Sequence, residues 1–214
     1  MDEFRIYIIG AGGHGTVVAE VLGLMGLQVS GFVDSARAAG SEVSGLPIVG
    51  DDTWLLEQAP RAIRLVNGIG VRADTTRRAA VFEHWTGKGF RFTEIRHPSA
   101  VVSASSRSAG SAQIMAGAIV QPGTRLGHNT VVNTGASIDH DCDLEDHVFV
   151  SPGTTICGSV FIGEGSFIGA GAVILPGTRI ERGAVVGGGT IVKGKVEACS
   201  KVVGNPARSI GGMR

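Results

Sequence analysis

The feature that most constrains this chain is a six-residue repeat that keeps its phase from Val102 to Val192. An aliphatic residue stands at every sixth position, with Ser108 as the one exception, and a small or β-branched residue follows four positions later from Ala118 to Thr190. An α-helix has a period of 3.6 residues and an ordinary strand a period of 2. A strict period of six is typical of a solenoid whose hexads form flat sides, three of which close one coil.

This hexapeptide pattern predicts a left-handed parallel β-helix. The aliphatic residue of each hexad should fill the interior, and the small residue should fit near the corner where the chain turns. The repeat itself indicates only the period and an 18-residue coil. The left hand is inferred from similarity to known hexapeptide-repeat proteins, because crossovers between parallel strands are almost always right-handed.

Composition excludes several classes of partner. The 214 residues include 19 basic and 19 acidic side chains, so no net charge attracts nucleic acid or an anionic membrane. The acidic start MDEFRIYIIG does not resemble a signal peptide, and no segment approaches the ~20 apolar residues of a membrane span. No CxxC pair is formed by the three cysteines, Cys142, Cys157 and Cys199. The simplest interpretation is that they are free thiols in a reducing compartment. We therefore expect a cytoplasmic protein.

The first 96 residues follow a different pattern, in which strands alternate with helices. Such alternation predicts a small parallel, Rossmann-like α/β domain over residues 1–96, followed by the β-helix domain over residues 97–214. His97-Pro98 marks the joint, because proline stops the preceding structure and the hexads begin at once after it. The expected elements are strands at 5–9, 28–33 and 63–66 and helices at 16–25 and about 72–85.

A glycine-rich turn, Gly10 to Gly15, follows the first expected strand and precedes a helix. It fits the GxGxxG pattern, and Asp34 lies 19 residues beyond Gly15. Such a turn lets the backbone approach a diphosphate, which the helix N-terminus attracts. A dinucleotide-dependent dehydrogenase with Asp34 on a ribose is one interpretation. The N-terminal half is short for a full six-stranded dinucleotide-binding fold, and His14 stands where that motif usually has a small residue. The diphosphate of a single mononucleotide therefore fits better. A tight turn without any ligand is the remaining alternative.

The hexad at 138–143 is the most unusual of the repeat, because it places His140 among three carboxylates. A histidine beside a carboxylate is suited to act as a general base. Eighteen residues on, Gly158 occupies the equivalent place in the next coil, and coils stack about 4.7–4.9 Å apart. An imidazole and an unshielded backbone N–H at that separation are what acyl transfer needs. The alternative is a solvated acidic rim with a bystander histidine.

A metal site is a further alternative. The γ-class carbonic anhydrases are also trimeric left-handed β-helices, with zinc held by histidines across a subunit interface. His128 and His147 lie 19 residues apart and would stack roughly on one side of the prism. His140 belongs to a different side of its coil, which argues against a shared site within one chain.

Taken together, several motifs resemble one family, the two-domain sugar acetyltransferases. The motifs are GAGGHG at 10–15, NGIG at 67–70, HPSA at 97–100, IDHDCDLEDHVFVSPG at 138–153 and the closing NPAR at 205–208. This family includes sialic acid O-acetyltransferases and N-acetyltransferases of nucleotide-linked 4-amino sugars. Within it, the chain is most similar to perosamine N-acetyltransferases. The resemblance covers residues 4 to about 210.

The resemblance implies transfer of an acetyl group from acetyl-CoA, without a metal, to the 4-amino group of a nucleotide-linked deoxy sugar. GDP-perosamine is the expected acceptor, a UDP-linked 4-amino sugar comes next, and sialic acid O-acetylation or a zinc hydratase is the alternative. The donor would lie between subunits of a homotrimer. His140 would be the general base, Asp141 its orienting partner and Gly158 the oxyanion donor. The residues implied for the nucleotide sugar are Gly12, Gly13, His14, Asp34, Asn67 and Ile69, and those for CoA are Gly158, Gly171, Asn205, Pro206 and Ala207.

One feature of the repeat departs from the wider superfamily: no loop interrupts the hexads. Selection of the sugar is therefore expected to come largely from the N-terminal domain. A nucleotide-binding scaffold without catalysis is the last alternative, and it would release no thiol from acetyl-CoA.

Overall fold

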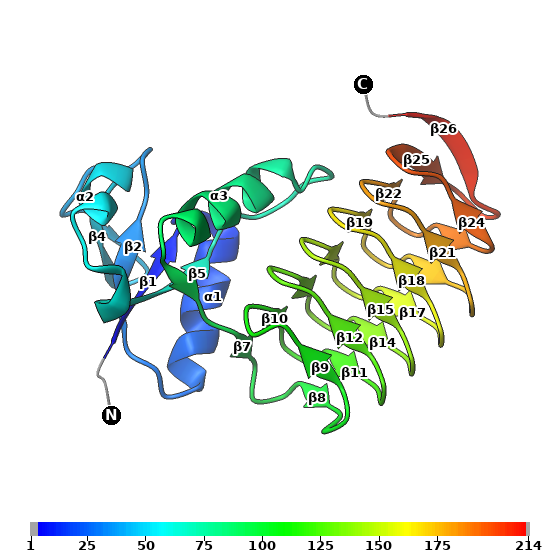
Figure 1. The fold of residues 1–214 in the computed structure, drawn as a ribbon, viewed down its shortest axis with the longest axis horizontal. Coiled ribbons are helices and arrows are strands. Elements are labelled where there is room, and N and C mark those ends of the chain that lie inside the picture. Colours follow the sequence, from blue (N-terminus) through cyan, green and yellow to red (C-terminus); the bar gives the residue numbers. More distant parts are fainter. Residues whose placement is uncertain (1–3, 213–214) are drawn as a thin grey trace. The chain divides into compact units, whose positions relative to one another are not determined.

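A computed structural model of the protein describes residues 4–212, which form two compact units. One unit holds the chain up to Gly70 together with Arg77–Pro98, and the other holds Val71–Thr76 together with the chain from Ser99 onward. Figure 1 shows a small α/β unit and a long stack of short strands. Among the described residues, no helix is long and apolar enough to span a membrane.

The first unit is built on a six-stranded sheet, with the order β3-β4-β2-β1-β5-β6. Every neighbouring pair is parallel except β3 with β4, which form an antiparallel hairpin. The strands are β1 (Arg5–Ile9), β2 (Val29–Val33), β3 (Glu42–Val43), β4 (Leu46–Gly50), β5 (Ile63–Asn67) and β6 (Arg91–Phe92), with β7 (Ile95–Arg96) after them. The predicted small parallel sheet is confirmed, and the β3–β4 hairpin is an addition that the sequence pattern did not indicate.

The helices of this unit are α1 (Gly13–Leu24), α2 (Asp52–Leu56) and α3 (Thr76–Gly87), with a short 3₁₀ turn at Pro60–Ala62. The helix α1 begins three residues before the predicted start at residue 16. Gly12 is its N-cap, in an extended conformation and without a side-chain cap. The second half of the glycine-rich turn is therefore the first turn of a helix, whose N–H groups have no intrahelical acceptors.

The second unit is the predicted left-handed β-helix. The strands of the coils up to Val192 are two residues long, and each pairs in parallel with the strand 18 residues further on, for example Gln113 with Val131 and Ser137 with Thr155. In the last coil the spacing falls to 16 residues, as in the pair of Arg179 with Lys195. Three stacked sheets result, which we call faces 1, 2 and 3 (Figure 1).

Each face collects every third strand. Face 1 comprises β10 (Gln113–Ile114), β13 (Val131–Val132), β16 (Phe149–Val150), β19 (Phe167–Ile168), β22 (Val185–Val186), β25 (Ser200–Val203) and the antiparallel β26 (Arg208–Gly212). Face 2 comprises β8 (Val101–Val102), β11 (Ile119–Val120), β14 (Ser137–Ile138), β17 (Thr155–Ile156), β20 (Val173–Ile174) and β23 (Ile191–Val192). Face 3 comprises β9 (Arg107–Ser108), β12 (Arg125–Leu126), β15 (Asp143–Leu144), β18 (Phe161–Ile162), β21 (Arg179–Ile180) and β24 (Lys195–Val196).

The interior of the β-helix is filled as the repeat predicts. The aliphatic series is buried from Ile114 to Val192, and the small residues are buried from Ala118 to Thr190. A hydroxyl at the small-residue position also links successive coils. Thr124 Oγ1 donates to the carbonyl of Asp139, 15 residues further on, at 2.8 Å. The exception Ser108 is exposed, near the first coil.

A row of apolar residues also lies on the outside of face 1, which an exposed β-helix would not favour. Val131, Phe149, Phe167 and Val185 are all buried, and Val71 and Ala73 pack against them. Thr75 Oγ1 adds a 2.7 Å hydrogen bond to the carbonyl of Gly165. The segment Val71–Thr76 is therefore bound to face 1, and this explains why α3 starts at Thr76 instead of near residue 72.

Candidate active site

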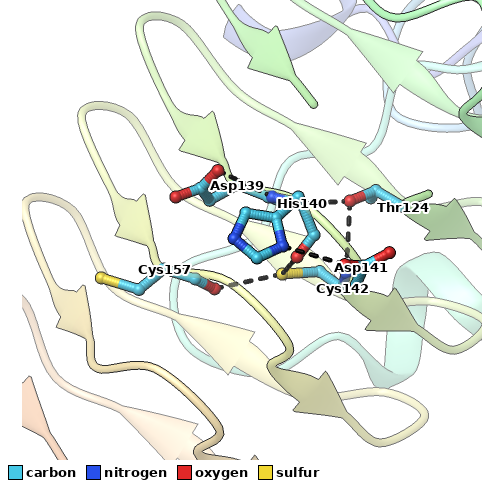
Figure 2. Close-up of polar contacts among 6 residues, drawn as sticks. All are labelled: Thr124, Asp139, His140, Asp141, Cys142 and Cys157. Atoms are coloured by element: carbon cyan, nitrogen blue, oxygen red, sulfur yellow. Dashed lines mark hydrogen bonds and ion pairs between the residues drawn. The ribbon is translucent and has the colours of Figure 1, made fainter. Parts of the chain in front are cut away.

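The histidine of the acidic hexad lies in the turn that joins face 2 to face 3, between β14 and β15. His140 Nδ1 is 2.9 Å from Asp141 Oδ2, and the backbone N–H of His140 donates to Asp139 Oδ1 at 2.8 Å (Figure 2). The side chains of His140 and Asp141 are 58% and 68% exposed. The pair is thus ordered by its own turn and open to a ligand.

Only one of the three carboxylates of the hexad contacts the imidazole. Asp143, the third acid of the hexad, pairs instead with Arg125 on face 3, where Nε donates to Oδ1 at 3.2 Å. Asp141 alone of the three contacts the ring, and as a carboxylate it is an acceptor, so Nδ1 carries the proton in the neutral imidazole. The lone pair of Nε2 then remains available to accept a proton.

The acidic surroundings raise the pKa of His140 above its usual value. The hydrogen bond to Asp141 is the largest cause, and the negative charge of Asp139 follows. Both favour the charged imidazolium. The histidine is therefore a stronger base than an isolated imidazole.

Gly158 lies next to the imidazole in the following coil, as the 18-residue arithmetic predicted. A Cβ built on Gly158 would come 2.7 Å from both Cε1 and Nε2 of His140, so any other residue here would displace the ring from this position. Within residues 4–212, no group accepts a hydrogen bond from the Gly158 N–H. The same place in the coils on either side of this pair is taken by Pro122 and Pro176, which have no N–H.

Gly123 has the corresponding relation to Asp141 in the preceding coil. Both residues have positive φ, +75° and +57°, and a Cβ on Gly123 would collide with Oδ1 of Asp141. Asp141 is further fixed because its N–H donates to the carbonyl of Pro122 at 3.0 Å. Sequence reasoning missed Gly123, although subtracting 18 from 141 would have found it.

Cys142 occupies the small-residue position of this coil and serves the interior. Its buried Sγ donates to the carbonyl of Cys157 at 3.2 Å (Figure 2), and burial raises the pKa of the thiol. A protonated, enclosed thiol is a poor nucleophile. The structure therefore supports a packing role for Cys142.

The two histidines of the metal alternative lie at another corner, between face 3 and face 1. His128 Nδ1 is 3.1 Å from the hydroxyl of Ser111, and His147 Nδ1 is 3.0 Å from Nδ2 of Asn129. The two residues follow one another in successive coils, as the sequence predicted, because the N–H of His147 donates to the carbonyl of His128 at 2.8 Å. Each ring also contacts a polar residue about one coil earlier. The structure does not bring either next to His140.

In the first unit, the predicted nucleotide-binding glycines differ in what the fold requires of them. A Cβ on Gly15 would collide with the carbonyl of Gly10, so close packing explains Gly15. Gly12 and Gly13 are exposed, lack a positive φ and have nothing within 4 Å of an added Cβ. Neither backbone strain nor contacts within the chain explain these two glycines, which lie at the open N-terminus of α1.

Asp34, at the end of β2, holds the glycine-rich turn. Its Oδ2 accepts from the N–H of Ala11 at 2.7 Å, and its Oδ1 accepts from the N–H of Ala36 at 2.8 Å. The dehydrogenase interpretation of the motif has this carboxylate on a ribose. In the structure, each oxygen of Asp34 accepts a hydrogen bond from the backbone. A carboxylate oxygen has a second lone pair, which can still accept a hydrogen bond from a sugar hydroxyl.

Asn67 is the last residue of β5 and Ile69 lies in the turn after it, beside the glycine-rich turn. Asn67 is buried, and its side chain is committed within the protein: Oδ1 accepts from the N–H of Ile69 at 3.1 Å and Nδ2 donates to the carbonyl of Arg78 at 3.0 Å. His14 is half-buried in the first turn of α1, and its Cβ lies 3.3 Å from a Cβ built on Gly70. Asn67 therefore shapes the turn, whereas His14 and Ile69 form its neighbouring surface.

The residues implied for the distal part of CoA lie at the corner between face 1 and face 2. Gly171 is exposed, and an added Cβ would meet nothing within 4 Å. Further along the same corner, Asn205–Ala207 follow β25, and the N–H of Ala207 donates to the carbonyl of Ile191 at 3.1 Å. This corner and that of His140 border opposite sides of face 2, so one chain does not bring these residues together with the base.

Comparison with known proteins gives the same two-part organisation. Residues 5–84 match the PglD N-terminal domain, and residues 159–194 match the bacterial transferase hexapeptide (six repeats). Among curated proteins, none matches the sequence at a significant level.

Several solved structures resemble the whole chain. Perosamine N-acetyltransferase from Caulobacter crescentus, solved with CoA and GDP-perosamine as a variant with asparagine in place of a histidine, is 34% identical. Its TM-score is 0.91, over 97% of each chain. The acetyltransferase domain of PglB from Neisseria gonorrhoeae FA1090, in complex with acetyl coenzyme A, is 34% identical with a TM-score of 0.89, over 96% of this chain and 98% of that one. WeeI from Acinetobacter baumannii AYE, at 23% identity and a TM-score of 0.76, shares the fold.

The identity and coverage of these relatives agree with the motifs and with the architecture of both units. The chain belongs to the family of acetyl-CoA-dependent sugar N-acetyltransferases that join a PglD-type N-terminal domain to a hexapeptide-repeat β-helix.

Proposed function

We propose that this enzyme transfers the acetyl group of acetyl-CoA to the 4-amino group of a nucleotide-linked deoxy amino sugar, with GDP-perosamine as the preferred acceptor and a UDP-linked 4-amino sugar next. The observation that carries the proposal is the pairing of His140 and Asp141 beside the N–H of Gly158. The relative from Caulobacter crescentus, solved with CoA and GDP-perosamine, supports the choice of donor and acceptor.

The proposed reaction is a direct transfer. The lone pair of the sugar amine attacks the thioester carbon, and a C–N bond forms as the carbonyl becomes an oxyanion. His140 Nε2 accepts the proton that the amine loses, while Asp141 stabilises the resulting imidazolium through Nδ1–H. The Gly158 N–H donates to the oxyanion. The C–S bond then breaks, the CoA thiolate leaves, and the amide remains on the sugar.

We assign the nucleotide sugar to the first unit, where Gly12, Gly13 and His14 present the N-terminus of α1 to a diphosphate. The donor is assigned to the β-helix. Because the base and the distal CoA residues lie on opposite sides of face 2, a second chain completes the groove in this proposal, and the active form is a homotrimer. The free thiols fit a reducing cytoplasm.

The function is tested by thiol release from acetyl-CoA, followed with a disulfide reagent, across three acceptor types. We expect release with GDP-perosamine, slower release with UDP-linked 4-amino-4,6-dideoxy sugars, and none with free sialic acid. Turnover with sialic acid alone would make the enzyme an O-acetyltransferase. Silence with every acceptor would contradict acetyl transfer, and metal analysis would then test the hydratase.

Replacing the base should remove most of the rate. We expect His140→Asn to lower kcat by ~10²–10⁴, the usual worth of a general base, and to leave CoA binding nearly unchanged. Steady-state kinetics and calorimetric titration with CoA measure the two effects. His128→Asn is the matched control, because that exposed ring lies at another corner. Near-normal turnover of His140→Asn would disprove the assignment of the base.

The pH profile reports on Asp141. The base acts in its neutral form, so kcat/KM falls as the pH drops through the raised pKa of His140. Asp141→Asn removes the main cause of that raised pKa, so the acidic limb should move to lower pH while kcat falls less than in His140→Asn. Asp143→Asn, which loses a carboxylate bound to Arg125, should leave the limb in place. The substrate amine titrates in the same way in all variants, so it does not affect the comparison. An acidic limb of the pH profile that stays in place in Asp141→Asn would contradict the pairing of His140 with Asp141.

The open glycines of the first unit test the nucleotide site. Gly13→Ala should leave thermal stability unchanged or slightly higher, because the added methyl group meets nothing and alanine favours helix. The KM for the nucleotide sugar should rise about tenfold, the equivalent of ~1.4 kcal/mol, because the methyl group keeps a diphosphate from the backbone. Gly23→Ala, in the same helix and equally unobstructed, should leave this KM unchanged. An unaltered KM in Gly13→Ala would place the diphosphate elsewhere.

A further inference from the structure

The first unit buries a complete guanidinium that the proposed chemistry does not use. Arg78, in the first turns of α3, is 1% exposed. Desolvation lowers its pKa to about 9, which still leaves it charged at neutral pH. Burying a charge is costly unless hydrogen bonds compensate, so the contacts of this side chain indicate what it does for the fold.

Those contacts converge on one backbone turn. Arg78 Nη1 donates to the carbonyl of Asn67 at 2.9 Å and to the carbonyl of Ile69 at 2.8 Å. In return, Asn67 Nδ2 donates to the carbonyl of Arg78, and Asn67 Oδ1 accepts from the N–H of Ile69. Three residues thus form a closed set of four hydrogen bonds that fixes the turn at residues 67–70 against α3.

The backbone at residues 67–70 also supports the glycine-rich turn at residues 10–15. The N–H of Gly68 donates to the carbonyl of Ile9 at 2.8 Å, and the side chain of Ile69 fills the space beside Gly10, 2.7 Å from where a Cβ would lie. Gly70 faces His14 in the same way, at 3.3 Å. A displacement of residues 67–70 would therefore be transmitted directly to the backbone at the start of α1.

We propose that Arg78 is a positioning residue for the nucleotide-sugar site, which it holds in shape by bridging the carbonyls of Asn67 and Ile69 beneath the two turns. It does not contact the substrate and acts through these turns. The inference rests on the proposed function, because it assumes that the turns bind the nucleotide part of the acceptor.

Two substitutions separate the donors of Arg78 from its bulk. Arg78→Met keeps an unbranched apolar side chain, two atoms shorter, and loses all donors, whereas Arg78→Lys keeps the positive charge and three donors on a side chain one atom shorter. We expect Arg78→Met to raise the KM for the nucleotide sugar by about tenfold or more, because two buried carbonyls lose their donor and the turn shifts. Arg78→Lys should recover part of this loss. Arg77→Met, exposed on the same helix, is the matched control and should behave as wild type.

The split between kinetic constants identifies positioning. A purely structural role would lower the thermal midpoint and the active fraction, hence the apparent kcat, but would leave KM unchanged in the molecules that fold. Positioning raises the KM for the nucleotide sugar and leaves the KM for acetyl-CoA unchanged, because the CoA residues lie in the β-helix. An unchanged KM for the nucleotide sugar in folded Arg78→Lys and Arg78→Met would overturn the inference.

Equilibrium binding of GDP and of UDP, measured by calorimetry on the full-length protein, distinguishes this inference from the proposed function. Weaker binding by Arg78→Met than by wild type and Arg77→Met supports positioning. Equal binding by all three overturns the role of Arg78 alone. A wild-type protein that binds neither nucleotide overturns the nucleotide site itself, and the inference with it. Should Arg78→Met not fold, Arg78→Lys decides by the same comparison.

Discussion

The backbone register between coils is the constraint on which the rest of the β-helix depends. Each coil donates its N–H groups to carbonyls of the next, as Ser137 does to Thr154 and Phe149 does to Ser166. This ladder makes residue i the neighbour of residue i+18 from Val101 to Val192, and only the last coil is shorter, with pairs 16 residues apart. A change in the length of an inner coil would shift every later pair, so the uninterrupted phase of the hexads keeps the inner coils in register.

The same register builds the corner around His140 from three successive coils. His140 and Asp141 occupy adjacent positions of one coil, and the side chain of each needs room in a neighbouring coil. Gly158 provides that room on one side and Gly123 on the other, since a methyl group at either would strike the pair. The pair of His140 and Asp141 is thus packed between two backbones, while the hydrogen bond between the two side chains holds the ring.

How far the sequence could go is also set by periodicity. The hexads predicted the β-helix, the buried series and the contact of His140 with Gly158, because a fixed period converts numbering into distance. The first unit has no such period. There the start of α1 at Gly13 and the β3–β4 hairpin depend on tertiary packing, and so does the late start of α3, whose preceding segment is held on face 1 by Val71 and Ala73. Arg78 was missed for the same reason, since a charged residue on a short helix gives no sign that it is buried.

The glycines show what a structure adds to a motif. In GAGGHG, the sequence treats four glycines alike, but the fold needs only two of them: Gly10 has positive φ, and Gly15 packs on the backbone of Gly10. Gly12 and Gly13 have ordinary backbone angles and open space. Glycine is a favoured N-cap at position 12, but at Gly13, the first residue of the helix, alanine would satisfy the chain by itself and would favour the helix. Gly13 thus costs helix propensity and gives nothing back to packing, which supports the proposal that a ligand contacts this N-terminus. Asp34 and Asn67 support it less, because the fold already uses their polar atoms.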